Sequence, residues 1–92
     1  MSHPVEVACS PAGSGWTCVV TVGTDAAATR HHVTVDAALL ARLRPGDDDP
    51  VDLVRDSFAF LLAREPREAI LGEFDLPVIG RYFPEWESEI AG

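Results

Sequence analysis

The chain contains no lysine, asparagine or glutamine, and its seven basic residues are all arginines. The lack of lysine excludes Schiff-base chemistry and a Walker-type phosphate loop, because both depend on a lysine amine. Acidic residues outnumber basic ones by 15 to 7, which gives a net charge of -8. Nucleic acids and anionic membranes are bound largely through lysine and arginine, so this balance predicts that neither is a partner.

Long apolar segments are also missing. No run approaches the roughly 18–20 apolar residues that cross a membrane, and the opening MSHPVEVACS has neither the basic nor the apolar segment of a secretion signal. We therefore expect a cytoplasmic protein. Hydrophobic residues make up 47% of the 92 and charged residues 24%. This composition and length predict one globular domain over residues 1–92.

The first part of the chain, residues 4–35, alternates between apolar and polar positions. This two-residue period is typical of a half-buried β-sheet. The alternation runs through VEVAC, WTCVVTV and RHHVTV, and turn-forming residues separate these segments at 10–15 and 23–29. The pattern predicts a three-stranded antiparallel meander.

The first turn predicts how the first two strands pair. With Gly13 and Ser14 at the centre of a tight hairpin, every inward residue faces another inward residue. The inward pairs are Val5 with Val22, Val7 with Val20, and Cys9 with Cys18. Directly opposed strand cysteines make strained bridges, and a cytoplasmic protein keeps its thiols reduced. We therefore expect two reduced core cysteines, with a disulfide as the alternative.

No pattern points to catalysis or to a metal. If Val22 pairs with His31, this histidine lies about 13 Å along the sheet from the cysteines, at ~3.3 Å per residue. Zinc ligands lie about 2.0–2.3 Å from the ion, so a shared site is not expected. The run DDDPVD lacks the calcium-loop pattern, and no serine lies in a nucleophile elbow. We predict no catalytic residue, no metal ligand and no cofactor.

The second part, residues 36–92, is predicted to be helical and interrupted by prolines. Asp36 is expected to cap a helix in AALLARL, and Asp49 a second one that starts at Pro50 and runs to about Arg64. PREAILGEF, LPVIGRYF and PEWESEI are expected to form further short helices. The fold class is therefore α+β: a three-stranded antiparallel β-meander followed by three to five short helices packed on one face.

The helix expected at 50–64 is apolar on two opposite sides. At 100° per residue, one stripe suits the sheet, and Leu53 and Phe60 lie opposite it. That stripe consists of Val51, Val54, Phe58, Leu61 and Leu62. The stretch FDLPVIGRYFPEWESEI (74–90) also has two apolar stripes. Either the C-terminal helices cover Leu53 and Phe60 within the chain, or part of this surface contacts another protein or a second copy.

Ser57 to Ile90 resembles the C-terminal half of a group of small bacterial proteins. The shared strings include REP (64–66), FDL (74–76) and YFPEW (82–86), within a wider pattern of SFxFLLxREP, ILxxFxL and IxxYFPE followed by Tyr or Trp. The resemblance covers about a third of the chain. No activity is established for that group, so the resemblance implies no catalytic residue.

The leading hypothesis is a non-enzymatic bacterial protein that acts through protein–protein contact or self-association, most simply as a homodimer. The candidate interface consists of Leu53, Phe60, Tyr82, Phe83 and Trp86, since aromatic anchors are favoured in interface cores. An acidic rim would steer a basic partner. Two alternatives stay open: an antitoxin-like or regulatory protein that neutralises a basic partner, and a small-molecule-binding protein or enzyme with a pocket near His31.

Overall fold

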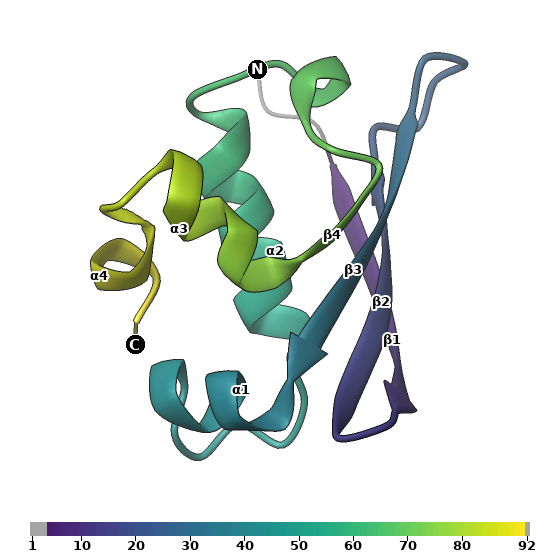
Figure 1. Cartoon of the computed structure of the whole chain (residues 1–92). Helices are drawn as coiled ribbons and strands as arrows, with labels where there is room; N and C mark the ends of the chain where they lie inside the picture. Colours follow the sequence, from purple (N-terminus) through teal and green to yellow (C-terminus); the bar gives the residue numbers. More distant parts are fainter. Residues whose placement is uncertain (1–3, 92) are drawn as a thin grey trace.

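A computed structural model of the chain describes residues 4–91. The described part forms a four-stranded sheet in the order β1-β2-β3-β4, with helices against one of its faces (Figure 1). The strands are β1 (Val5–Ala12), β2 (Gly15–Val22), β3 (Thr29–Asp36) and β4 (Glu73–Asp75). The helices are α1 (Ala37–Leu43), α2 (Val51–Leu62), α3 (Ile79–Tyr82) and α4 (Trp86–Ile90), with 3-10 turns η1 (Arg67–Ala69) and η2 (Leu76–Val78). The α+β class is confirmed.

The hairpin β1–β2 has the predicted register. Cys9 lies opposite Cys18 and Val5 lies opposite Val22 in an antiparallel pair. Gly13 has a φ of 57°, a backbone angle that glycine adopts freely and that a tight hairpin needs at this position. The apolar alternation and one glycine were therefore enough to align the two strands.

The pairing of β2 with β3 differs from the prediction by two residues. Val22 lies opposite Thr29, and His31 lies opposite Val20, so the expected pair of Val22 with His31 is wrong. The loop between the strands is closed by its own hydrogen bonds, in which the main-chain N–H of Ala28 donates to the Asp25 carbonyl (3.1 Å). A shift by two residues keeps the same side chains inside, so the alternation alone does not distinguish the two registers.

The expected helix PREAILGEF is also wrong over most of its length. Only η1 is helical, and the chain then extends so that β4 pairs with β3 in parallel, with Glu73 opposite His32. The His32 N–H donates to the Gly72 carbonyl (2.8 Å) just before β4 begins. The sheet is therefore mixed and four-stranded instead of a three-stranded antiparallel meander. Phe74 points from β4 towards the helices, with its ring centroid 6.1 Å from that of Phe58.

Both expected caps precede helices. Asp49 accepts a hydrogen bond from the Val51 N–H (3.0 Å), which satisfies one of the free donors at the start of α2. Helix α2 begins directly after Pro50 and ends at Leu62, slightly short of the expected Arg64. Asp36 precedes α1 without bonding its N–H groups. Its carboxylate accepts a hydrogen bond from Ser14 instead (3.2 Å).

The core lies between the sheet and α2, and a second layer of packing lies between α2 and the C-terminal segment (Figure 1). The sheet contributes inward side chains from β2 and β3 that are essentially inaccessible to solvent: Cys18, Val20, Val22, Val33 and Val35. Helix α2 contributes Leu53, Val54, Phe58, Phe60 and Leu61. Because α2 is buried on both sides, the way each side is covered determines which surface is left for a partner.

Candidate functional site

The five candidate interface residues separate into two groups. Leu53 and Trp86 are fully buried, and Phe60 is 7% exposed. Tyr82 is 67% exposed, and Phe83 is half-buried. The C-terminal segment therefore covers the second side of α2 within the chain, which is the first of the two explanations that the sequence left open. Of the five, only Tyr82 and Phe83 offer appreciable surface to a partner.

Trp86 is part of the chain's own packing. Its indole Nε1–H donates to the Ser57 hydroxyl (3.1 Å), which in turn donates to the Leu53 carbonyl (2.8 Å). A buried tryptophan N–H needs such a partner, because leaving it unsatisfied costs free energy. The ring of Phe83 packs edge-on against Phe60, with 5.8 Å between centroids. These contacts fix the C-terminal segment against α2.

Arg64 links the end of α2 to the C-terminal segment through electrostatic contacts. Its guanidinium lies 3.5 Å from the centroid of the Phe60 ring and donates to the Phe60 carbonyl (3.0 Å) at the C-terminal end of α2. It also forms ion pairs with Glu85 (3.5 Å) and Glu89 (3.1 Å). A cation is favourable both over an aromatic face and near a helix C-terminus. These partners neutralise Arg64, which directly precedes Glu65 in the sequence.

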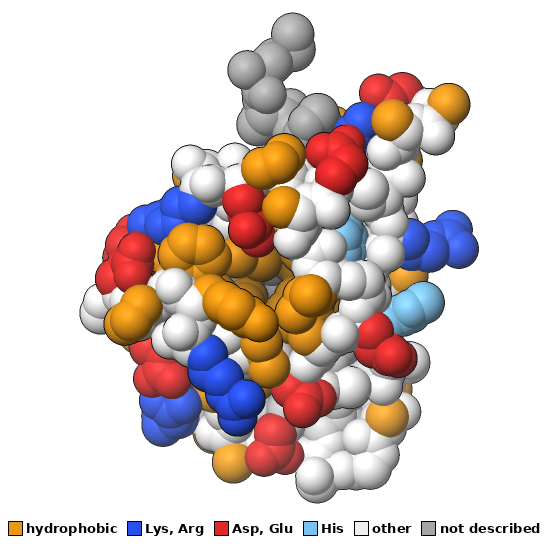
Figure 2. All heavy atoms as spheres, turned by 45° about the horizontal axis from the view of Figure 1, so that its top comes forward, with side chains coloured by type: hydrophobic (Ala, Val, Ile, Leu, Met, Phe, Trp, Pro, Cys, Tyr) orange, Lys and Arg blue, Asp and Glu red, His pale blue; other side chains and the backbone are white. Residues whose placement is uncertain are grey.

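An apolar groove opens where the end of α2, the segment before β4 and helix α3 come together. Its volume is about 370 Å³, and Figure 2 shows hydrophobic side chains gathered around the hollow. Leu71 and Tyr82 lie at this groove and are the large hydrophobic residues that stay exposed within residues 4–91, at 47% and 67%. The lining also includes Leu61, Ile70, Phe74, Ile79 and Phe83.

The groove carries a negative charge of its own. Glu65 lines it, and no ion pair involves this carboxylate among residues 4–91. The chain as a whole has a net charge of -8. An apolar surface with one unpaired carboxylate suits a ligand that combines apolar groups with a cation.

Sequence reasoning found Tyr82 and Phe83 but missed Leu71 and Glu65. Ile70 and Leu71 are adjacent apolar residues in an extended stretch, where neighbouring side chains point in opposite directions. Ile70 is 7% exposed and Leu71 is 47% exposed, as this geometry requires. In an extended segment this adjacent apolar pair indicates one exposed residue, but the sequence pattern predicts a helix here, and that prediction hides the signal.

His31 is buried, and both of its ring nitrogens have hydrogen-bond partners within the protein. Its Nδ1 lies 2.7 Å from the Leu71 carbonyl oxygen, and its Nε2 lies 2.9 Å from the Thr29 hydroxyl. The ring packs on Phe58 with 5.3 Å between centroids. His31 does not line the groove itself. It is linked to the groove only by its hydrogen bond with the main-chain carbonyl of Leu71, which does line it. We assign it no chemical role.

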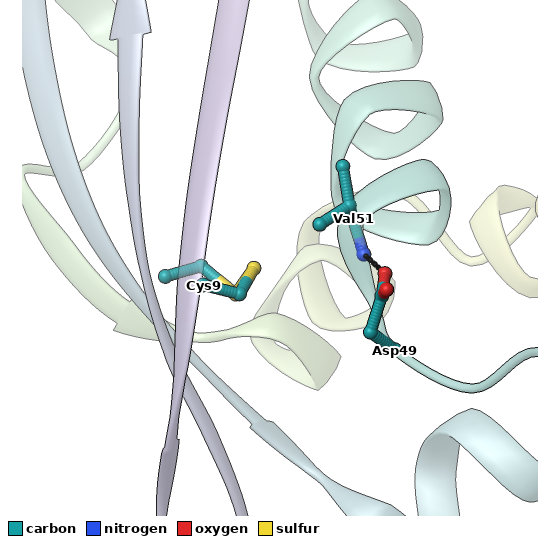
Figure 3. Close-up of a disulfide and its surroundings, with 4 residues drawn as sticks. Cys9, Asp49 and Val51 are labelled. Carbon is teal, nitrogen blue, oxygen red and sulfur yellow. Dashed lines mark hydrogen bonds between the residues drawn. A yellow bond between two sulfur atoms is a disulfide. The ribbon is translucent and has the colours of Figure 1, made fainter.

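Cys9 and Cys18 form a disulfide between β1 and β2, so the expectation of two reduced cysteines is wrong. Their pairing in the register places the two Cα atoms 4.0 Å apart. The bond lies on the helix-facing side of the sheet, beside the first turn of α2 (Figure 3). The prediction relied on the strain expected in a bridge between directly opposed strand cysteines and on the expected reducing compartment, and neither argument held for this pair.

The distance argument against a shared zinc site also changes. His31 lies opposite Val20, only two positions along β2 from Cys18, instead of the four that the sequence predicted. Within residues 4–91 no group of three or more His, Cys, Asp or Glu side chains is arranged to hold a metal ion.

Comparison of the chain with protein-family models, with curated proteins and with solved structures finds no match. The resemblance of Ser57 to Ile90 to a bacterial group therefore stays a prediction. The part of the chain that the structure describes includes no helix of the length and apolarity needed to cross a bilayer. The groove is the surface feature on which a functional proposal rests.

Proposed function

We propose that the protein is a non-enzymatic binding module whose groove takes apolar anchors from a basic, amphipathic helical segment of another protein. The observation that supports this most strongly is the groove itself, where exposed Leu71 and Tyr82 lie beside the unpaired carboxylate of Glu65. Exposed hydrophobic residues that gather around a hollow, instead of being scattered singly, are often found at contact or ligand sites.

The charge of the chain favours a basic partner over a second copy at this surface. Two copies meeting at this groove would bring their Glu65 carboxylates together, and like charges in a contact oppose association. A partner with arginine or lysine beside its apolar anchors would pair with Glu65 and be steered by the field of the whole chain. A protein that neutralises a basic toxin would be a special case of this proposal, distinguished by the partner's own activity.

The dimensions of the groove favour a short segment. A volume of about 370 Å³ lies near the lower end of the roughly 300–1,000 Å³ range of ligand pockets. This space suits two apolar side chains from one helical turn, and an amphipathic helix presents such anchors at positions three or four residues apart. The open rim leaves room for the flanking residues of the helix to reach Glu65.

Two matched synthetic peptides test the proposal. Both are amphipathic helices with the same leucine and phenylalanine anchors, but one carries arginine flanks and the other glutamate flanks. Amide chemical shifts of the isotope-labelled protein report binding and its location. We expect the arginine peptide to shift Leu71, Tyr82 and Phe83, to bind far more tightly than the glutamate peptide, and to weaken as salt is added.

Variants then locate the contact. Tyr82→Ala and Leu71→Ala should each weaken binding of the arginine peptide roughly fivefold or more, and Glu65→Gln should reduce the preference for arginine flanks. His32→Ala, on the exposed face of the sheet, is the matched control and should bind like the wild type. Equal binding of the two peptides, or equal loss in the control, would contradict the proposal. A small apolar compound that fills the groove when neither peptide binds would replace the protein partner with a small ligand.

A further inference from the structure

The open edge of β1 is a second surface, independent of the groove. Strand β1 lies at one end of the sheet and β4 at the other. The β4 edge is only three residues long, whereas β1 has eight. An unpaired edge strand presents free N–H and C=O groups that pair readily with another strand, and a very short edge strand is one way of limiting this. The β1 edge lacks that protection.

The hydrogen bonds show which residues of β1 face outward. In an antiparallel pair, alternate residues bond to the neighbouring strand and the others direct their N–H and C=O away from it. The Gly23 N–H donates to the Pro4 carbonyl (2.8 Å). The even-numbered residues that follow Pro4 therefore bond to β2. Val5, Val7 and Cys9 direct their main-chain groups to the open edge.

The remaining features of β1 agree with an edge that can accept a strand. Its pairing with β2 runs without a bulge from Val5 to Ala12, and Glu6 is its one charged residue. Pro11 has the same outward orientation as Val7, which is where an edge strand tolerates the missing N–H. The usable edge is therefore Val5 to Cys9, with three outward donors and three outward acceptors.

We propose that β1 pairs antiparallel with β1 of a second copy of this chain, about a two-fold axis at Val7. Val7 then faces the second copy's Val7, and Val5 faces the second copy's Cys9. Each such pair exchanges two hydrogen bonds, so every outward group from Val5 to Cys9 is satisfied. The side chains of these residues are only half-buried in one copy, and the pairing brings Val7 next to Val7 and Val5 next to Cys9 of the second copy.

The other symmetric registers are poorer. An axis at Glu6 places two carboxylates directly opposite each other, which is unfavourable. An axis at Ala8 places Pro11 opposite Val5, and an axis at Cys9 places it opposite Val7. In both cases two hydrogen bonds are lost, one at each symmetric position, because Pro11 of each copy has no N–H. The axis at Val7 avoids both problems, since Glu6 then faces the uncharged Ala8 of the second copy.

Self-pairing and groove binding differ in their dependence on salt. Two copies with a net charge of -8 each repel one another at long range, so salt should strengthen the β1 dimer. Binding of a basic segment in the groove should weaken under the same conditions. The self-pairing does not rest on the proposed function, and either can fail without the other.

Amide hydrogen exchange over a range of protein concentrations, alongside sedimentation equilibrium, tests the dimer. At low concentration the amides of Glu6, Ala8 and Ser10 should be protected, while those of Val5, Val7 and Cys9 exchange fast. As the dimer forms, the second set should become protected as well. A chain that sediments as a monomer at every concentration, or a dimer in which Val7 stays unprotected, would overturn the proposal.

A charge exchange tests the register. Ala8→Glu places a carboxylate opposite Glu6 of the second copy at two symmetric positions, and should raise the dimer dissociation constant roughly two- to thirtyfold. Adding Glu6→Lys to this variant should restore the affinity. Ala41→Glu, at an exposed position of α1, changes the net charge equally and should leave the dimer intact. An equal effect of Ala8→Glu and Ala41→Glu, with both variants folded, would contradict this register.

Discussion

Helix α2 is covered on its two sides by parts of the chain that are built differently. On one side the sheet presents a regular layer, and the ring of Phe58 packs against His31 and Phe74 at 5.3 and 6.1 Å. On the other side, short helices bring Trp86 and Phe83 against Ser57 and Phe60. The first cover depends on strand pairing, and the second on individual aromatic residues, one buried hydrogen bond and the Arg64 ion pairs.

This difference explains where exposed apolar surface is left. The sheet covers its side of α2 with neighbouring strands, so the apolar residues Val54 and Phe58 are completely enclosed. The C-terminal cover consists of separate turns interrupted by prolines, and it leaves the groove uncovered beside Tyr82. The surface available to a partner therefore arises where the irregular cover ends, and each side of α2 can be weakened separately.

On the sheet side the largest effect is expected from Phe58→Ala. Phe58 is fully buried, and large-to-small changes of this kind cost about 3–5 kcal/mol through lost burial and the cavity left behind. If the variant still folds without denaturant, its urea denaturation midpoint should be much lower than that of the wild type. If the loss exceeds the total stability, the variant should be unfolded even without urea. A loss below about 1 kcal/mol would show that the sheet does not pack on α2 in this way.

The disulfide should come next. Cys9 and Cys18 are separated by 9 positions, and in the chain-entropy account closing a loop of this size stabilises the folded state by about 2–3 kcal/mol. Reductant should lower the unfolding midpoint of the wild type and leave a Cys9→Ala, Cys18→Ala variant unchanged. The same midpoint for wild type with and without reductant would contradict a stabilising bond.

On the C-terminal side, Ser57→Ala removes the acceptor of the Trp86 N–H. The buried donor is then unsatisfied, and stability should fall by about 1–3 kcal/mol. Trp86→Phe in the Ser57→Ala background should cost less than Trp86→Phe alone, because the donor is already unpaired. Equilibrium denaturation of the four proteins in this double-mutant cycle measures the coupling, and strictly additive losses would argue against the hydrogen bond.

The smallest effect concerns the contact between α1 and α4. The hydrogen bond and ion pair with Arg42 (2.6 Å) lower the pKa of Glu87 from its ordinary value. A carboxyl group whose pKa is lowered on folding stabilises the protein above its unfolded pKa, and this contribution is lost as the pH falls through the lower folded pKa. Both side chains are largely exposed, so the contribution is small and screened by salt.

Arg42→Met should therefore make the thermal unfolding midpoint fall slightly less steeply as the pH is lowered from neutral to acidic. Thermal unfolding of wild type and variant at low salt, from neutral to acidic pH, provides the comparison. Their midpoints should differ at neutral pH and converge once Glu87 is protonated in both. A constant difference across the whole range would mean that Arg42 acts through packing and not through this carboxylate.

Much of the sheet side was predictable from the sequence. The alternation around Val7 and Val20 identified two strands, and Gly13 set their register, because a tight turn leaves few options. Strand β4 was not predictable, since the three residues Glu73–Asp75 are too few to establish a period and depend on the free edge of β3. The β2–β3 register was ambiguous because a shift by two residues keeps the same side chains inside.

The candidate site was predicted only in part. Spacing showed that the helix at 50–64 and the terminal stretch both had surplus apolar faces, which is correct. It did not show that Trp86 would fold back onto Ser57, because the prolines allow several chain directions. Only the folded structure shows which of these residues are core and which are surface. Trp86 is buried and Tyr82 is exposed, although the two lie only four positions apart in the sequence.

The central claim is that the C-terminal segment is core at Trp86 and exposed surface at Tyr82, and one paired unfolding measurement tests it directly. Trp86→Ala should lose about 3–5 kcal/mol of stability, and Tyr82→Ala should stay within about 0.5 kcal/mol of the wild type. In thermal unfolding, each kcal/mol corresponds to a shift of roughly 4–8 °C for a domain of this size. A Trp86→Ala protein that unfolds like the wild type, or a Tyr82→Ala protein that unfolds far below it, would contradict the claim.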